Sequence, residues 1–212
     1  MQKTERKINW SIYLIGFVIS SLIFGMGFWF GSQIEKDVSE GLRKTMDATR
    51  SGIVSIETMM ALENDSSFCT FFLDEMSKFD RETFDLGQKI GYMEERKEID
   101  PQLKADYMSL ELRDYLLAKK INARCGSNAT LVLYFLSSSS CPDCLDQGNE
   151  LTKAREQDSL KVYSFDLDVN NSLTGSLKQM HDVTRYPTLI IGDKKYEGHL
   201  TSQDILNAAA TD

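Results

Sequence analysis

The chain has 212 residues, of which 26% are charged and 42% are hydrophobic, and this composition is typical of a globular protein. Its formal net charge of -8 argues against a nucleic-acid-binding protein. Recognition of phosphates depends on clusters of Lys and Arg, and no such cluster interleaved with aromatic residues occurs in the sequence. We therefore expect no nucleic-acid partner.

An apolar run without a charged side chain extends from Ile8 to Phe30. About 20 apolar residues in a helix cross the hydrocarbon core of a bilayer, and Trp10 and Trp29 stand near the two ends, where amphipathic rings favour the interface. A cleaved signal peptide is the alternative, but its apolar region is usually shorter and ends at small residues, whereas this run ends in GFWFGSQ. Residues 1–33 are therefore predicted to form a cytoplasmic N-terminus and a transmembrane helix.

Basic residues flank this run on its N-terminal side. Lys3, Arg6 and Lys7 precede it, whereas the first residues after it carry no basic excess. By the positive-inside rule, the N-terminus stays in the cytoplasm and the rest of the chain lies outside. The prediction is a single-pass membrane protein with an extracytoplasmic C-terminal domain. In an oxidising compartment of this kind, the four cysteines can form lasting disulfides.

Residues 34–126 have apolar side chains three or four positions apart, which predicts an α-helical segment of three amphipathic helices. The third begins with Asp100 as its N-cap and a proline at its first helical position. If the second and third helices form an antiparallel hairpin about a turn near residue 99, Cys69 and Cys125 fall near the same open end. We interpret this pair as a structural disulfide, and two separate buried thiols are the alternative.

After residue 126 the pattern changes to strands that alternate with helices. Strands are predicted in ATLVLYFLS, in KVYSFDLDV and, on either side of Gly192 and Asp193, in TLIIGDKKYEG. Helical stretches lie around 143–157, 172–182 and 202–210. Thr201 opens the last of them, with Asp204 at a capping-box spacing. Residues 127–212 are thus predicted to form an α/β sandwich with the order β-α-β-α-β-β-α, whose right-handed βαβ unit brings the first two strands parallel.

The sequence CPDC, with Cys141 and Cys144, stands between the first strand of this part and its first helix. A thiol at a helix N-terminus is favoured as a thiolate, so Cys141 is the expected nucleophile. Pro142 suits the first helical turn because it has no N–H to leave unpaired. Cys144 lies about one turn further on, close enough to attack a mixed disulfide, and is the expected resolving thiol.

The order and spacing of these segments resemble the thioredoxin superfamily, since CPDC follows LVLYFL and is followed in turn by KVYSFDLDVNN, RYPTLII and KYEGHL. The resemblance covers residues 129–210. The whole chain is similar to membrane-anchored thioredoxin-like proteins that have a helical stalk before the domain. It implies a redox-active Cys141–Cys144 disulfide, with no other cofactor, that faces a cis-proline loop at Tyr186 and Pro187. That loop pairs with the extended substrate chain, and Pro142 is also expected to contact it. An ordinary trans proline is the alternative.

Two residues depart from the family pattern. Cytosolic thioredoxins have a buried Asp six residues before the first cysteine, where this chain has Phe135. A Trp usually precedes the motif, where this chain has Ser140. The general base of thioredoxins is therefore expected to be missing.

We thus expect a membrane-anchored, extracytoplasmic thiol–disulfide oxidoreductase that acts on protein disulfides and exchanges electrons with a membrane or soluble redox partner. Two alternatives stay open. The CxxC pair with His181 and His199 could hold copper or zinc, although neither His has a paired spacing, and no metal site is predicted. The α/β domain could also be a non-catalytic docking module in which CPDC is a static disulfide.

Overall fold

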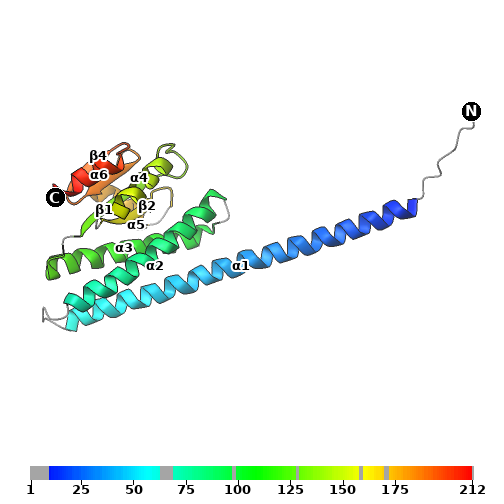
Figure 1. The fold of residues 1–212 in the computed structure, drawn as a ribbon, viewed down its shortest axis with the longest axis horizontal. Coiled ribbons are helices and arrows are strands. Elements are labelled where there is room, and N and C mark those ends of the chain that lie inside the picture. The colour runs from blue at the N-terminus through cyan, green and yellow to red at the C-terminus, as the bar shows by residue number, and fades with distance from the viewer. Residues whose placement is uncertain are drawn as a thin grey trace, which may run out of the picture. The chain divides into compact units, whose positions relative to one another are not determined.

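The computed structural model describes residues 10–62, 69–96, 99–127, 129–157, 160–169 and 172–211. The chain divides into two compact units, Met1–Arg43 and Lys44–Asp212. The division falls inside α1 (Trp10–Leu62), a helix that no proline interrupts (Figure 1). The domain boundaries predicted after residues 33 and 126 stay predictions.

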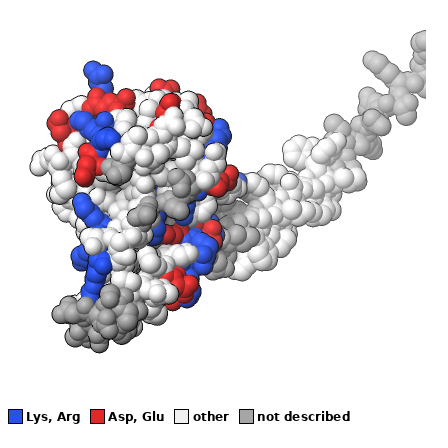
Figure 2. Space-filling model, turned by 60° about the vertical axis from the view of Figure 1, so that its left-hand side comes forward, with Lys and Arg blue, Asp and Glu red and all other residues white. Residues whose placement is uncertain are grey.

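The first unit contains the apolar stretch Trp10–Gly31 of α1, which is long and apolar enough to cross a membrane. Its large apolar side chains are exposed, and none of its residues is charged, so its surface is white in Figure 2. By length and composition, this stretch could serve as a membrane span or as a signal sequence.

In the second unit, α2 (Cys69–Glu95) and α3 (Pro101–Cys125) form an antiparallel hairpin (Figure 1). The Asp100 carboxylate accepts the N–H of Gln102 and caps α3, and Gly126 ends it in the left-handed conformation at φ 63°. The helices bury apolar side chains along one stripe each, including Met46, Ile53 and Ile56 of α1, Phe72, Met76, Leu86 and Ile90 of α2, and Leu103, Leu110, Leu117 and Ile121 of α3.

A disulfide joins Cys69 at the start of α2 to Cys125 at the end of α3, with 5.4 Å between the two Cα atoms. The pair therefore lies at the open end of the hairpin. The bond closes a long loop, because the two residues are 56 positions apart in the sequence.

A four-stranded sheet forms the centre of the α/β part, in the order β2-β1-β3-β4. β1 (Thr130–Leu136) pairs in parallel with β2 (Leu160–Asp166) and antiparallel with β3 (Thr188–Ile191). β4 (Lys194–Glu197) pairs antiparallel with β3 and forms an edge. The parallel β1–β2 pair confirms the βαβ unit predicted from the sequence.

The sheet is covered on both faces. On one face, α4 (Cys144–Gln157) and α6 (Ser202–Ala209) enclose a core with Val132, Leu189 and Ile205 (Figure 1). The predicted capping box opens α6. On the other face, the ring of Tyr115 in α3 packs on the ring of Tyr163 in β2, with centroids 5.5 Å apart. α3 is thus both an arm of the hairpin and a layer of the sandwich.

Candidate functional site

The cysteine pair lies where β1 leads into α4, and its two sulfurs form a disulfide. Cys141 is partly exposed, whereas Cys144 is buried, with 6% of its surface accessible. A partner molecule can therefore approach the first sulfur but is kept from the second. This difference suits an attacking thiol followed by a resolving thiol.

α4 begins at Cys144, later than the sequence predicted, so Pro142 lies in the turn before the helix and not in its first turn. The N–H of Cys144 donates to the carbonyl oxygen of Cys141 at 3.4 Å, which closes this turn. The first bond with helical spacing follows from the N–H of Gln147 to the carbonyl of Asp143 at 2.9 Å. Pro142 fits the turn because its ring fixes φ and it has no N–H to satisfy. Cys141 still lies directly before the positive end of the helix dipole.

The cysteine pair follows the central strand β1, which pairs in parallel with β2 and antiparallel with β3, and helices cover both faces of this sheet. Strand order, strand directions and the place of the CxxC pair agree with the resemblance found in the sequence. This is a thioredoxin-like fold. It carries the cysteine pair that a thiol redox role requires.

Comparisons with known proteins find likeness to solved thioredoxin structures. Chloroplastic thioredoxin z is 25% identical, with a TM-score of 0.35 over 44% of this chain and 87% of its own. Thioredoxin-2, a component of the malaria parasite protein secretion machinery, is 23% identical, with a TM-score of 0.34 over 40% of this chain and 84% of its own. No protein-family model and no curated protein matches the sequence. Both TM-scores are low, so the thioredoxin-like assignment rests on the sheet order and the cysteine pair.

The four serines before CPDC form a turn around Asp168, which follows β2. The carboxylate of Asp168 accepts the N–H of Ser139 at 2.7 Å and the hydroxyl of Ser137 at 2.9 Å. The same hydroxyl oxygen of Ser137 accepts the N–H of Ser140 at 3.0 Å, next to Cys141. Partial burial alone would raise the pKa of Asp168, but these hydrogen bonds outweigh it and lower that pKa. This role of Asp168 was not predicted from the sequence.

Lys104 of α3 connects the helical hairpin to the serine turn. Its ammonium group is ion-paired with Glu94 of α2 and with the buried Asp166 at the end of β2. Asp166 in turn accepts the N–H of Ser138 at 3.4 Å and that of Asp168 at 2.9 Å. Burial would lower the pKa of Lys104, but its bonds to Asp166 and Glu94 outweigh this effect and raise it. Residues far apart in sequence thus hold the loop that carries Cys141.

Tyr134, rather than Phe135, lies beside the cysteine pair. The hydroxyl of Tyr134 donates to the carbonyl oxygen of Cys144 at 2.6 Å, and both residues belong to the same buried core. Phe135 points to the opposite face, where its ring packs on those of Phe165 and His181. Burial, with a smaller contribution from the charge of Asp166, raises the pKa of Tyr134, so its hydroxyl stays protonated and able to donate.

The Tyr186–Pro187 peptide bond is cis in the structure. Tyr186 is partly buried and packs against the same core as Cys141. Pro187 is buried, and its carbonyl oxygen accepts the N–H of Gly198 at 2.8 Å. The part that Tyr186, Pro187 and Pro142 take in substrate binding stays a prediction.

The histidines considered as metal ligands do not gather with the cysteines. His181 packs on Phe135, and burial, followed by the charge of Lys119, lowers its pKa. Within the described ranges, no group of three or more His, Cys, Asp or Glu side chains could hold a metal ion.

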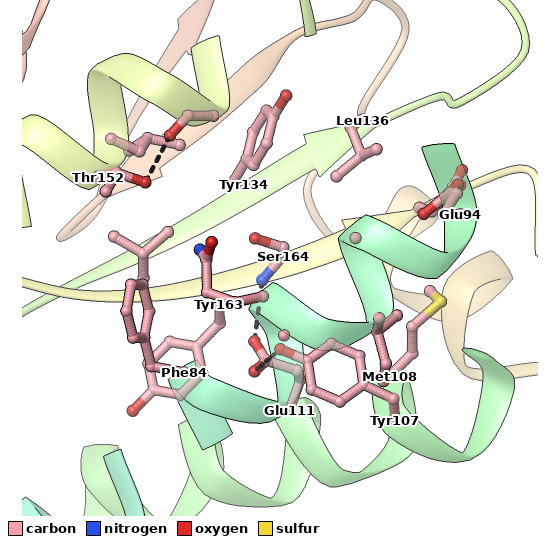
Figure 3. A pocket seen from close by; sticks show the side chains of 18 of the residues that line it. Phe84, Glu94, Tyr107, Met108, Glu111, Tyr134, Leu136, Thr152, Tyr163 and Ser164 are labelled. Carbon is pink, nitrogen blue, oxygen red and sulfur yellow. Dashed lines mark hydrogen bonds between the residues drawn. The ribbon is translucent and has the colours of Figure 1, made fainter. Parts of the chain in front are cut away.

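A cavity of about 750 Å³ extends from Cys141 and Cys144 between the hairpin and the thioredoxin-like fold. Figure 3 shows Glu111 of α3 between Tyr107 and Ser164. Its carboxylate accepts the Tyr107 hydroxyl at 2.7 Å and the Ser164 N–H at 3.0 Å. Burial nevertheless raises the pKa of Glu111 to about 7.

Asp114 lies one helical turn further along α3 and also lines the cavity. Burial, followed by the negative charges of Asp80 and Glu111, raises the pKa of Asp114 to about 8. Neither of the two buried acids of α3 was predicted from the sequence. The only signal in the sequence was their spacing of three residues next to the apolar positions Leu110 and Leu117.

Proposed function

We propose that this chain is a membrane-anchored thiol–disulfide oxidoreductase that acts on protein disulfides outside the cytoplasm. The thioredoxin-like fold and its cysteine pair support a thiol redox role. The observation that carries the proposal is the unequal exposure of the pair, because Cys141 is partly exposed and Cys144 is buried. The apolar stretch Trp10–Gly31 and the basic residues before it support the anchor and its orientation.

The reaction begins with the reduced pair. The Cys141 thiolate attacks one sulfur of a substrate disulfide, so that a Cys141–substrate S–S bond forms and the other substrate sulfur leaves as a thiolate. The Cys144 thiolate then attacks the Cys141 sulfur, which releases the second substrate thiolate and closes the Cys141–Cys144 disulfide. Two electrons pass from the pair to the substrate. A dithiol partner protein returns two electrons, and the reverse sequence oxidises a substrate.

Residues around the pair support these steps. The dipole of α4 favours the Cys141 thiolate, and Tyr134 holds the backbone of Cys144. We propose that Tyr186, Pro187 and Pro142 contact the substrate backbone, and the packing of Tyr186 against the same core as Cys141 supports this.

The test uses the full chain in detergent with Cys144→Ser and Cys141→Ser. Cys144→Ser is expected to trap partner proteins as mixed disulfides that thiol reductants release. Cys141→Ser is expected to trap none and to reduce no model protein disulfide. If Cys141→Ser keeps the activity of the wild type, or if the wild type has none, the pair is a static disulfide and the domain a docking module.

A further inference from the structure

The cavity beside the cysteine pair contains a groove between one face of α2 and one face of α4. Its walls come from positions three or four apart on each helix, namely Phe84, Gly87, Gln88 and Gly91 of α2 and Leu145, Gly148, Asn149 and Thr152 of α4. We call this the α2–α4 groove. Seven positions along a helix span about 10 Å, which is the length of about three residues of extended chain.

Arg155 of α4 closes the end of the groove away from the cysteines. Its guanidinium lies 4.2 Å from the centre of the Phe84 ring and donates to the carbonyl oxygen of Asp80 at 3.2 Å. Cys141 and Cys144 line the other end of the same cavity. A chain that enters beside the cysteines therefore runs toward Arg155 and the acidic residues next to it.

Glycine residues leave part of the space between the two walls unfilled. A Cβ atom at Gly91 or at Gly148 would meet no atom within 4 Å, so the space beside both residues is open. A Cβ atom at Gly87 would instead lie 2.5 Å from the Tyr107 hydroxyl, so Gly87 is needed for packing. Gly91 and Gly148 are therefore the positions where a larger side chain fills the groove without moving its neighbours.

Acidic residues outnumber basic ones in the cavity lining, with Asp80, Glu94, Glu111, Asp114 and Asp166 against Lys104, Arg155 and Lys161. Four of these acids have partners. Asp80 pairs with Lys161 at 2.5 Å, Glu94 and Asp166 pair with Lys104, and Glu111 accepts two hydrogen bonds.

Asp114 differs from these four acids because one of its buried oxygens has no hydrogen-bond partner among the described residues. It is 1% exposed, and its Oδ1 has no hydrogen-bond partner in the described part of the chain. The buried hydroxyls of Thr83 and Tyr163, which line the same cavity, also lack one among the described residues. A buried carboxyl oxygen without a hydrogen-bond partner is costly, and a bound cation that donates hydrogen bonds would both satisfy it and favour the ionised carboxylate.

We propose that the α2–α4 groove binds the substrate segment next to the reactive cysteine, with a Lys or Arg side chain about three residues from that cysteine directed to Asp114. This inference rests on the proposed function and names its substrate class. Tyr186 and Pro187 do not line this cavity. The groove is thus a second contact with the substrate, on a side of the cysteine pair that the hairpin builds.

The test measures reduction of symmetrical disulfide dimers of two peptides, acetyl-Ala-Cys-Ala-Ala-Lys-amide and acetyl-Lys-Ala-Ala-Cys-Ala-amide. Each is compared with the same peptide carrying norleucine in place of Lys. Wild-type protein in detergent, recycled by dithiothreitol, is expected to reduce one Lys peptide about tenfold faster than its norleucine analogue, which corresponds to one charge-assisted hydrogen bond. Hydroxyethyl disulfide, which is too small to fill the groove, serves as the reference substrate.

Gly91→Leu and Gly148→Leu fill the groove, and Asp114→Asn removes the carboxyl group that would ionise when a Lys or Arg side chain binds. Each is expected to bring the Lys-to-norleucine ratio close to one while the rate with hydroxyethyl disulfide stays unchanged. Gly175→Leu in α5 (Ser172–Met180) is the matched control, because a Cβ atom there also meets nothing within 4 Å and the residue does not line the cavity. Circular dichroism of each variant verifies its folding, and the leucine variants carry the test if Asp114→Asn does not fold.

Calorimetry with the serine analogues of both peptides separates this inference from the proposed function. If the wild type reduces the Lys and norleucine peptides equally fast, the groove holds only water and the inference fails, while the oxidoreductase stands. If the wild type reduces no disulfide but binds a Lys serine analogue that Gly91→Leu does not bind, the groove stands and the proposed function fails. Equal binding of Lys and norleucine analogues also overturns the inference.

Discussion

Tyr134 donates a hydrogen bond to the carbonyl oxygen of Cys144 at 2.6 Å, from the buried strand next to the cysteine pair. The bond fixes the backbone of Cys144 at the point where α4 begins. It also places a neutral donor near the pair. In the proposed reaction, Cys144 attacks beside a hydroxyl that stays protonated.

Tyr134→Phe is expected to destabilise the oxidised protein by about 1 to 2 kcal/mol, because a buried carbonyl loses its donor. Urea unfolding followed by circular dichroism measures the change. Tyr163→Phe is the matched control, since the hydroxyl of Tyr163 has no hydrogen-bond partner among the described residues and its loss should cost nothing. Equal losses in the two variants would show that the bond to Cys144 adds no stability.

The double variant Cys69→Ser and Cys125→Ser is expected to unfold with a free energy lower by about 4 kcal/mol, because the native bond closes a long loop in the unfolded chain. Its disulfide exchange rate should stay near that of the wild type, because the Cys141–Cys144 pair is intact. The control is the double variant Cys141→Ser and Cys144→Ser, which opens a loop of only three positions and should lose less stability. A larger loss of stability in this control would contradict the assignment of Cys69–Cys125 as the structural disulfide and Cys141–Cys144 as the redox pair.

Asp114→Asn tests the pH dependence of stability. The pKa of Asp114 is about 8 in the folded protein, against an ordinary value of 3.8, so the folded state holds a proton that the unfolded state has released. The free energy of unfolding should therefore fall as the pH rises from about 4 to about 8, and then level off. Glu111, with a pKa of about 7, contributes in the same direction in both proteins.

Urea unfolding at pH 5 and pH 8 measures this dependence. The decrease in unfolding free energy between the two values should be smaller in Asp114→Asn than in the wild type. Asp85→Asn, at an exposed position of α2, is the matched control and should keep the wild-type decrease. If all three proteins lose the same free energy, the Asp114 carboxyl does not titrate as its burial requires.

Lys104→Met is expected to lower the unfolding free energy by about 3 kcal/mol, because it leaves the buried Asp166 without its cation. The exchange rate should fall as well, since Asp166 holds the backbone of the serine turn before Cys141. Lys78→Met, which breaks an exposed ion pair with Asp74, is the control and should change both quantities little. If Lys104→Met is less stable but exchanges disulfides at the wild-type rate, the ion pair with Asp166 stabilises the fold and does not affect the reaction.

Much of the fold could be predicted because its signals are local. Asp100 and Pro101 begin α3 and Gly126 ends it, since a cap, a missing N–H and a left-handed turn are properties of neighbouring residues. The strand–helix–strand order of β1, α4 and β2 predicted a parallel pair that the structure confirms. The CxxC spacing likewise predicted a redox pair before any fold was known.

The sequence did not reveal which residue of β1 lies beside the cysteine pair. Successive residues of a strand face opposite sides of the sheet, so an error of one position exchanges Tyr134 for Phe135. The conformation of the serine turn sets which face of β1 lies next to Cys141. That conformation depends on Asp168, which belongs to a different loop. The start of α4 at Cys144 could not be predicted for the same reason, because the turn before the helix sets it and helix propensity does not.

Hydrophobic period, capping and cysteine spacing act within a few residues, so the elements, their order and the CxxC pair could be predicted from the sequence alone. The surroundings of that pair depend on contacts between distant parts of the chain. Lys104 meets Asp166 across 62 positions and Glu111 meets Ser164 across 53, so no local pattern records either contact. The burial of Asp114, and with it the groove beside the cysteines, exists only once α3 has packed against the sheet.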